Sequence, residues 1–130
     1  MAITCDRVRG QKLFIRPLEP ADSEPVGAFL GRWKPAAAVP RLGLVGKLVG
    51  ELAAVLAMEI TDDALEITDL VVAEPLRRKR VGRVMIDEAT ALAAKMEKDW
   101  LVAQPGRADG FLKRVGFVEG EGVLKRGVGR

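Results

Sequence analysis

Residues 65–82 read LEITDLVVAEPLRRKRVG, and this stretch decides the fold class. Its first half, through Val72, is rich in β-branched and aliphatic residues and predicts a strand. Pro75 ends the extended segment, and from Val81 to Lys98 the apolar residues recur at the spacing of one helix face. The stretch therefore predicts a strand, a basic loop and the start of a long helix, in that order.

The basic loop is the main charge anomaly of a chain whose formal net charge is only +3. Residues 77–83 hold five cations and no anion, whereas residues 59–74 hold several carboxylates and no cation. Cations are unfavourable at a helix start, which carries a partial positive charge and unsatisfied N–H groups. Residues 77–82 also include no Ser, Thr, Asp or Asn to cap those groups. A bound phosphate would satisfy the amides and neutralise the arginines.

Two other interpretations of the basic loop stay open. A run of four basic residues is often a solvated turn, and it can also be a weak nucleic-acid patch. The position between a strand and a helix favours the anion site over the solvated turn. Nucleic acid is the less favoured partner because no aromatic residues interleave the run for stacking on bases.

The segments on either side complete an α/β (α+β) pattern. We expect a mixed, mostly antiparallel sheet of about six to seven strands with helices on both faces. The turn between the second and third strands is placed at Gly46-Lys47. The expected order is a strand at 12–18, a helix from Asp22 or Ser23 to about Gly31, strands at 42–45, 48–60 and 64–72, a helix at 81–98, a strand at 100–103, a helix at about 107–115, and a hairpin of 117–119 with 123–125.

Composition fits one domain over residues 1–130, with residues 1–10 interpreted as a flexible extension. The chain has no His, no Tyr and a single cysteine, Cys5. These absences exclude an imidazole base, a phenol acid, an internal disulfide and a cysteine-cluster metal site, and we predict no metal. No apolar run has the length of a membrane span and the start does not resemble a signal peptide, so we expect a cytoplasmic protein without membrane contact.

Three motifs resemble the GCN5-related N-acetyltransferase (GNAT) superfamily. The stretch Leu65 to Gly82 resembles its motif A, a strand followed by Q/R-x-x-G-x-G/A and a long helix. Phe111 to Phe117, FLKRVGF, is similar to its later F-Y-x-x-x-G-F motif. Ile15 to Asp22, IRPLEPAD, resembles its first strand and helix start. All three occur in the family's order and together cover most of residues 12–119.

The resemblance implies that acetyl-CoA is a co-substrate, held in a V-shaped opening between the strands at 64–72 and 100–103. Backbone groups of two strand residues would hold the pantetheine arm, and the basic loop would hold the pyrophosphate. The cofactor-binding residues implied in this way are Val71, Val72, Arg77, Arg78, Lys79, Arg80, Val81, Gly82 and Arg83.

Direct acetyl transfer to a primary amine is the reaction that the resemblance implies. Glu66 occupies the position of the general-base glutamate in the histone-acetyltransferase branch and is our first candidate for the base. Asp69 is the second candidate. Period-two alternation places Asp69 on the opposite face from Glu66, unless a bulge near Leu70 changes the parity.

Two residues depart from the family pattern. Arg80 stands where motif A has its first glycine, and Leu112 stands where many members have the tyrosine that protonates the leaving thiolate. We therefore keep a catalytically degenerate acyl-CoA-binding or regulatory domain as the alternative, and a small nucleic-acid-binding protein as a third hypothesis. The sequence does not define the amine acceptor, although the short segment 32–41 suggests an open acceptor side or one completed by a second subunit. Homodimers are common in the family, and the sequence does not decide this point.

Overall fold

The computed structural model describes residues 4–8, 11–77, 80–106 and 109–129. The strands are β1 (Thr4–Val8), β2 (Gln11–Pro17), β3 (Gly43–Leu48), β4 (Glu51–Ile60), β5 (Ala64–Val72), β6 (Trp100–Ala103), β7 (Val118–Gly120) and β8 (Val123–Gly127). The helices are α1 (Ser23–Trp33), α2 (Val81–Lys95) and α3 (Asp109–Arg114), and the short 3-10 turns are η1 (Pro20–Asp22) and η2 (Glu74–Leu76).

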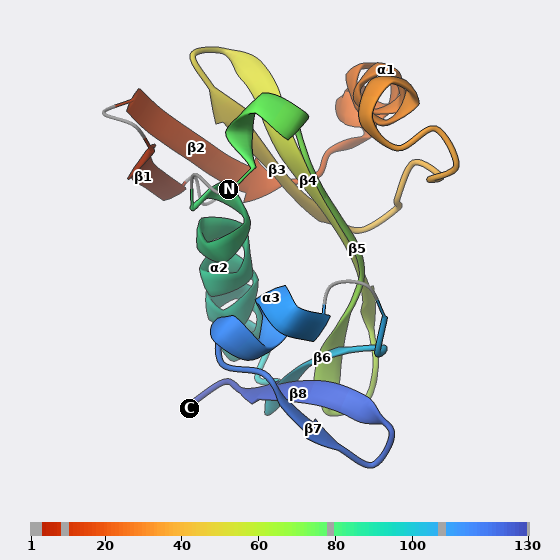
Figure 1. The fold of residues 1–130 in the computed structure, drawn as a ribbon, viewed down its shortest axis with the longest axis vertical. Coiled ribbons are helices and arrows are strands. Elements are labelled where there is room, and N and C mark those ends of the chain that lie inside the picture. Colours follow the sequence, from red (N-terminus) through yellow and green to blue (C-terminus); the bar gives the residue numbers. More distant parts are fainter. Residues whose placement is uncertain (1–3, 9–10, 78–79, 107–108, 130) are drawn as a thin grey trace.

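One sheet joins all the described strands, in the spatial order β1-β2-β3-β4-β5-β6-β8-β7 (Figure 1). Neighbouring strands pair antiparallel except β5 and β6, which are parallel and joined through α2. The predicted fold class, a mixed and mostly antiparallel sheet with helices on both faces, is confirmed.

The sheet has one strand beyond the predicted six to seven. Residues 4–8, interpreted from sequence as part of a flexible extension, form β1 and pair antiparallel with β2, from Thr4 opposite Ile15 to Val8 opposite Gln11. The segment lacks a period-two apolar pattern, and its backbone pairing with β2 is what places it in the sheet. Apolar periodicity therefore could not reveal it.

The hairpin between β3 and β4 turns later than predicted. Val49 and Gly50 have φ values of 52° and 79°, the left-handed pair that a two-residue hairpin turn requires. The predicted turn at Gly46-Lys47 is wrong, since both residues lie inside β3. A Cβ on Gly46 would lie 3.0 Å from the Sδ of Met85, so this glycine allows α2 to approach the sheet closely.

Helix α2 is also shorter than the predicted 81–98. It ends at Lys95, and Glu97 then adopts a φ of 59°. The N–H of Lys98 donates to the carbonyl of Ala93 at 2.9 Å, which closes the helix end with the pattern that typically follows a left-handed residue. Apolar spacing continues past that point because Met96 still packs against the core.

The two faces of the sheet carry separate apolar clusters. Helix α1 covers one face, and α2 with α3 covers the other (Figure 1). The α1 side contains Val26, Phe29, Leu30, Val45, Val55, Val71 and Ala73. The α2 side is larger and includes Leu13, Ile15, Leu44, Leu56, Leu65, Ile67, Met85, Ile86, Leu101, Leu112 and Leu124. The sheet is thus buried on both sides around its centre, where β4 and β5 lie.

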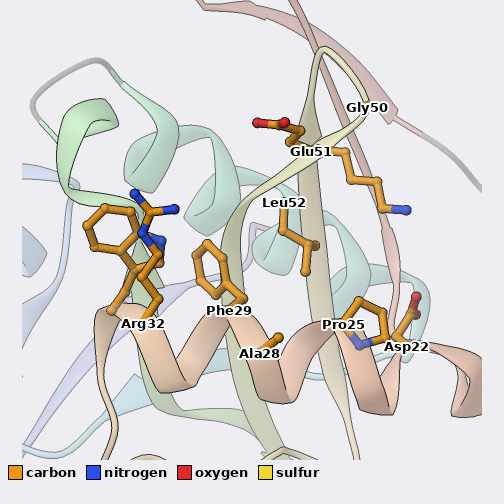
Figure 2. Close-up of a pocket in the computed structure, with 10 residues that line it drawn as sticks. Asp22, Pro25, Ala28, Phe29, Arg32, Gly50, Glu51 and Leu52 are labelled. Carbon is orange, nitrogen blue, oxygen red and sulfur yellow. The ribbon is translucent and has the colours of Figure 1, made fainter.

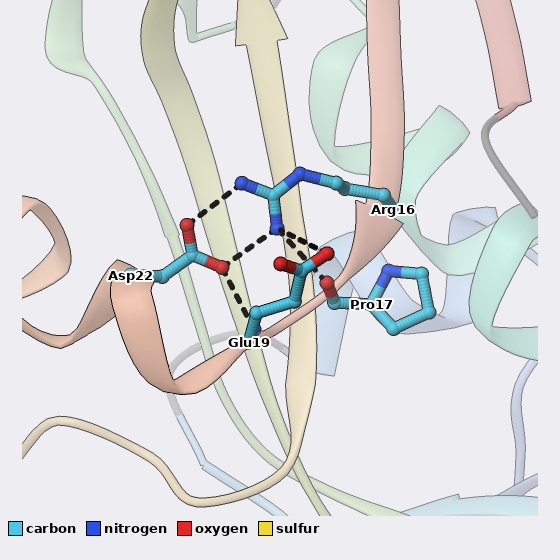
Figure 3. A network of polar contacts seen from close by, with 4 residues as sticks. All are labelled: Arg16, Pro17, Glu19 and Asp22. Atoms are coloured by element: carbon cyan, nitrogen blue, oxygen red, sulfur yellow. Dashed lines mark hydrogen bonds and ion pairs between the residues drawn. The ribbon is translucent and has the colours of Figure 1, made fainter. Parts of the chain in front are cut away.

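A network of hydrogen bonds joins the end of β2 to the turn η1, directly before α1 (Figure 3). The guanidinium of Arg16 donates from Nη1 to Asp22 Oδ2 at 2.6 Å and from Nη2 to Asp22 Oδ1 at 2.7 Å. The backbone N–H of Glu19 donates to the same carboxylate at 2.7 Å. Asp22 is only 6% exposed, and the hydrogen bonds from Arg16 are the main cause that lowers its pKa to about 2. The carboxylate therefore stays charged although it is buried.

Candidate active site

A cavity of about 890 Å³ lies along the C-terminal half of β5. One end is formed by Trp33 and Lys34, at and just after the end of α1, and the other by the first residues of α2. The far wall comes from the end of β6, the loop that follows it, and α3. A single hollow therefore connects the acidic strand β5 to the basic loop that the sequence analysis singled out.

The cavity exists because β5 and β6 separate partway along their length. They pair in parallel only from Ala64 opposite Trp100 to Ile67 opposite Ala103. Beyond that point β6 ends, whereas β5 continues to Val72 with β4 as its partner. The other edge of β5 faces the cavity, at the opening that the sequence resemblance implied.

Hydrogen-bond alternation identifies which β5 residues present backbone groups to this edge. The N–H of Ala73 donates to Ala53 on β4 at 2.9 Å, so the groups of Val72 point away from β4. Consistent with this, the carbonyl of Val72 accepts a hydrogen bond from Arg77 Nε at 3.4 Å. The same alternation directs the backbone groups of Val71 toward β4, which leaves Val72 as the better placed of the two predicted residues.

A bulge in β5 sets the position of the two candidate bases. The β4–β5 register passes from Ala57 opposite Asp69 to Met58 opposite Ile67, so Thr68 is the extra residue. Because of this insertion, Glu66 and Asp69 project from the same face of the sheet. The simple period-two placement on opposite faces is wrong, and the parity change that a bulge would cause is present.

The two carboxylates differ in their surroundings. Asp69 lines the cavity, and its Oδ1 accepts hydrogen bonds from Lys34 Nζ at 2.7 Å and from the Leu70 N–H at 3.0 Å. Glu66 is not among the lining residues, and its Oε2 accepts a bond from Gln104 Nε2 at 3.1 Å. Gln104 does line the cavity, so Glu66 lies one side chain behind the wall.

The start of α2 provides the anion-binding features. Arg80 is the N-cap residue and adopts a left-handed conformation with φ 72° and ψ −2°. Within the described part of the chain no side chain caps this end, so the N–H groups of residues 81–83 face outward without a side-chain acceptor. The left-handed backbone explains why motif A usually has a glycine here.

The predicted cofactor-binding residues at and after the basic loop fall into two groups: most line the cavity, and one packs its side chain in the core. Arg77, Arg80 and Arg83 line the cavity together with Gly82. The side chain of Val81 is 1% exposed and packs in the core, so only its backbone is available to a ligand. Arg78 and Lys79, also predicted to bind the cofactor, lie outside the described residues.

Gly82 brings α2 close to α3. A Cβ at this position would lie 3.2 Å from Cζ of Phe111 and 3.7 Å from Leu70 Cδ2. Phe111 and Leu112 both line the cavity, and Leu112 is 6% exposed. The later FLKRVGF motif therefore forms the wall opposite β5. Its Leu112 stands at the position where many family members have a tyrosine.

Sequence reasoning missed two charged residues of the cavity. Arg114 lies in the quoted FLKRVGF motif, so its proximity to the basic loop was within reach of the motif analysis. Lys34 follows α1 in the irregular segment 34–42, where no periodicity or motif links it to Asp69, 35 residues later in the chain. Only the tertiary fold brings these two residues together.

A second, smaller hollow of about 380 Å³ lies between α1 and the β3–β4 hairpin (Figure 2). Phe29 and Leu52 line it, with Lys47 and Glu51 from the hairpin. Trp33 lines both hollows, and the guanidinium of Arg32 lies 4.6 Å from the centre of its ring. Of the segment 32–41 that was predicted to be irregular, Arg32 and Trp33 belong to α1 and the rest forms no helix. No second helix therefore follows α1 at the Lys34 end of the large cavity.

Neither a metal cluster nor a membrane helix is found in the described ranges. No group of three or more His, Cys, Asp or Glu side chains there could hold a metal ion. No helix there is both long enough and apolar enough to cross a membrane.

The fold and the cavity between its separated parallel strands define an acetyltransferase-type domain. The sequence over residues 11–117 matches the acetyltransferase (GNAT) family, and the chain belongs to that family. The resemblance inferred from the three motifs is thereby confirmed. A comparison with curated proteins finds no match.

Solved structures with the same fold include proteins from archaea and bacteria. Ard1 from Thermoplasma volcanium has a TM-score of 0.69 and 18% identity, over 91% of this chain and 99% of that one. N-acetylglutamate synthase from Neisseria gonorrhoeae, complexed with coenzyme A and L-arginine, has a TM-score of 0.76 and 18% identity, over 91% of this chain but only 34% of that one. A GNAT family acetyltransferase from Brucella melitensis in complex with acetyl-CoA has a TM-score of 0.71 and 16% identity, over 91% and 89%. At these identities the likeness concerns the fold.

Proposed function

We propose that this chain is an acetyl-CoA-dependent N-acetyltransferase that transfers the acetyl group directly to a primary amine. The observation that carries the proposal is the 890 Å³ cavity of a GNAT-family chain, which joins an uncapped, arginine-lined helix start to the open edge of β5. The acetyl-CoA complex of the Brucella melitensis relative supports this choice of co-substrate.

The residues at the α2 end fit a pyrophosphate. Amides of residues 81–83 supply oriented N–H donors, and a phosphate there would also interact favourably with the helix dipole. Arg77 and Arg83 line this cavity beside the helix start, Arg114 of α3 lines it as well, and together they supply the positive charge. Arg80 adds a side-chain donor at the position where the family has glycine, and Arg78 and Lys79 complete the proposed basic set.

The open edge of β5 fits the pantetheine arm. An amide-containing chain lying along this edge would pair with the outward N–H and C=O groups of Val72 as a further strand would. Arg77 Nε must then release the Val72 carbonyl, to which it now donates at 3.4 Å, and turn toward the phosphates. A bond of this length is weak, so the exchange costs little.

Acetyl-CoA supplies the activated thioester, and the protein must supply a neutral amine beside it. A carboxylate at the acceptor end of the cavity can accept the amine's proton, directly or through water. Asp69 lines that end, and Glu66, which accepts a hydrogen bond from the cavity residue Gln104, would reach it through a water molecule. We keep both residues as proposed bases: the sequence resemblance favours Glu66, and the cavity lining favours Asp69.

Leu112 favours one alternative function, a domain that binds acyl-CoA without turnover. Its side chain faces the cavity where a tyrosine hydroxyl would protonate the thiolate, and the chain contains no tyrosine to replace it. A thiol has a pKa of about 8.5, so its thiolate is a moderate leaving group. In the enzyme that we propose, water therefore suffices to protonate it.

Cofactor binding is tested first, by a thermal-shift titration with acetyl-CoA. Acetyl-CoA at 100 times its Kd would stabilise the fold by about 2.7 kcal/mol, several degrees for a domain of this size. Dephospho-CoA serves as the matched ligand, since it keeps the pyrophosphate. No shift with either ligand at millimolar concentration would overturn both the enzyme and the acyl-CoA-binding alternative.

Turnover is tested next, by thiol release from acetyl-CoA over a panel of primary amines. The proposed enzyme releases thiol in proportion to acceptor, and Asp69→Asn or Glu66→Gln lowers kcat about 100-fold at whichever residue is the base. Binding without amine-dependent thiol release would instead support the acyl-CoA-binding alternative.

A further inference from the structure

The amine closest to the candidate base belongs to the protein itself. Lys34 Nζ lies 2.7 Å from Asp69 Oδ1, and both residues line the large cavity. We propose that Lys34 is an acetyl acceptor of this chain: the domain modifies its own lysine when acetyl-CoA is bound. This inference rests on the proposed acetyl-CoA-dependent function.

The direction of the cavity places the reactive end of the co-substrate near this amine. Phosphates held at the start of α2 mark one end, and the pantetheine arm follows the edge of β5 away from it. From Val72 back to the bulge at Thr68 the strand covers roughly 13 Å, and there β5 meets β6 again. The thioester therefore lies at the closed end of the split, where Asp69 and Gln104 line the wall.

The contacts hold the lysine in place instead of leaving it to sample the surface. The backbone N–H of Lys34 donates to the carbonyl of Leu30 at 2.7 Å, which fixes its backbone to the last turn of α1. Asp69 is fixed in turn by the Leu70 N–H at 3.0 Å. The Lys34 side chain is still 51% exposed, so water reaches its amine. A held amine beside a bound thioester has the high effective concentration of an intramolecular reaction.

The reaction balances without a further reagent. The ammonium group of Lys34 first gives one proton to Asp69, which passes it on to water, and the freed lone pair of Nζ attacks the thioester carbonyl carbon. A C–N bond forms, the C–S bond breaks, and its electron pair leaves with sulfur as the thiolate. The second amine proton is transferred through water to that thiolate. The products are N-acetyl-lysine at position 34, coenzyme A as the free thiol, and one released proton.

Acetylation would also change the site. The acetylated side chain carries no charge, so it no longer forms the ion pair with Asp69. Asp69 then becomes available to the ammonium group of a separate acceptor. Unmodified Lys34 thus occupies the place of a cationic acceptor, and its acetylation opens that place.

Isotope-labelled acetyl-CoA and peptide mass spectrometry test the proposal on the full-length protein without any added amine. Lys95, an exposed lysine at the end of α2, reports the background rate of chemical acetylation. We expect labelling of Lys34 to exceed that of Lys95 by about tenfold or more, because the thioester is held beside it. The rate constant should not change on dilution of the protein, and it should saturate with acetyl-CoA at the concentration that saturates the thermal shift.

Each other outcome overturns the inference. If acetyl-CoA binds but Lys34 is labelled no faster than Lys95, the self-acetylation is wrong while the cofactor site stands. If acetyl-CoA does not bind, the proposed function fails together with it. A Lys34 rate that rises in proportion to protein concentration means transfer between molecules, not within one. Lys34→Arg keeps a cation beside Asp69 and removes the acceptor, so it should lose the labelled peptide and retain the thermal shift.

Discussion

The chain before helix α1 and the chain before helix α2 differ in how their polar groups are satisfied. No described side chain caps the amides of α1 either, but the 3-10 turn η1 leads directly into this helix, and the N–H of Ser23 donates to the carbonyl of Pro20. The turn itself is held by Asp22, which is buried and accepts two hydrogen bonds from Arg16 and one from the Glu19 N–H. At the start of α2, Arg80 adopts a left-handed backbone and no described side chain caps the amides. The turn before α1 is therefore closed by groups of the protein, whereas the start of α2 is open and lies beside the cations Arg77, Arg80 and Arg83. An unsatisfied helix start inside a cavity is therefore the part of this fold that needs a ligand.

Removing the closed contact gives the largest expected effect on stability. Asp22→Ala leaves the partly buried guanidinium of Arg16 without its bidentate partner, and it should lower the free energy of unfolding by about 2–4 kcal/mol. Urea denaturation measures this change. Glu19→Gln is the matched control, since its carboxylate is 3.9 Å from Arg16 Nη1, and the loss there should stay within about 0.5 kcal/mol.

Acid should weaken the same contact in the unchanged protein. The pKa of Asp22 is lowered from 3.8 to about 2 in the fold, so the unfolded chain binds its proton first as the pH falls. The stabilisation is complete above pH 3.8 and is lost between that value and about pH 2, with a size of about 2 kcal/mol. Urea midpoints of the wild type and Asp22→Asn should converge through this window. A gap that stays constant down to pH 2 would contradict the assignment.

The open helix start should respond in ligand affinity and not in stability. Arg83→Ala removes one cation from the cavity and should weaken acetyl-CoA binding about tenfold, or 1.4 kcal/mol. Isothermal titration calorimetry measures the affinity, and Lys95→Ala controls for a general change in charge. The free energy of unfolding should change by less than about 0.5 kcal/mol, because Arg83 is exposed. An equal loss of affinity in both variants would mean that the effect is not local.

The smallest effect should come from the left-handed residue itself. Arg80→Gly relieves the backbone cost of a side chain at φ 72° and should stabilise the fold by about 1 kcal/mol. Arg80→Ala removes the same charge and keeps the backbone cost, so the pair separates the two contributions. Thermal unfolding without ligand measures the first, and acetyl-CoA affinity measures the second. A stability gain of equal size in both variants would show that charge repulsion, and not the backbone, is relieved.

The motifs predicted the fold class because each couples a local structure to its neighbours. The 65–82 stretch fixed a strand, loop and helix, and the family match over residues 11–117 agrees with it. Errors arose where local patterns admit two explanations. Gly46 was interpreted as a turn residue, but it serves a close helix–sheet approach, and the turn lies at Val49 and Gly50.

Predictability of the site also divides along physical lines. Residues that belong to the basic loop or directly follow it, such as Arg77 and Gly82, could be placed at the cavity from the motif alone. The relation of Glu66 to Asp69 could not, since one inserted residue, Thr68, reverses the parity. Lys34 depends on the packing of α1 against the sheet, which no local pattern encodes.

The split between β5 and β6 also bears on solubility. A row of unpaired backbone groups is usually a hazard, because a strand from another molecule can add to it. Here the row belongs to β5, which lies in the middle of the sheet, and it faces the gap toward β6, with α3 on the opposite wall of the cavity. The outermost strands of the described sheet, β1 and β7, are only five and three residues long. The chain thus keeps a long hydrogen-bonding template inside a cavity, where a narrow ligand can lie along it, and not at the outer edge of the sheet, where a strand from another molecule adds most readily.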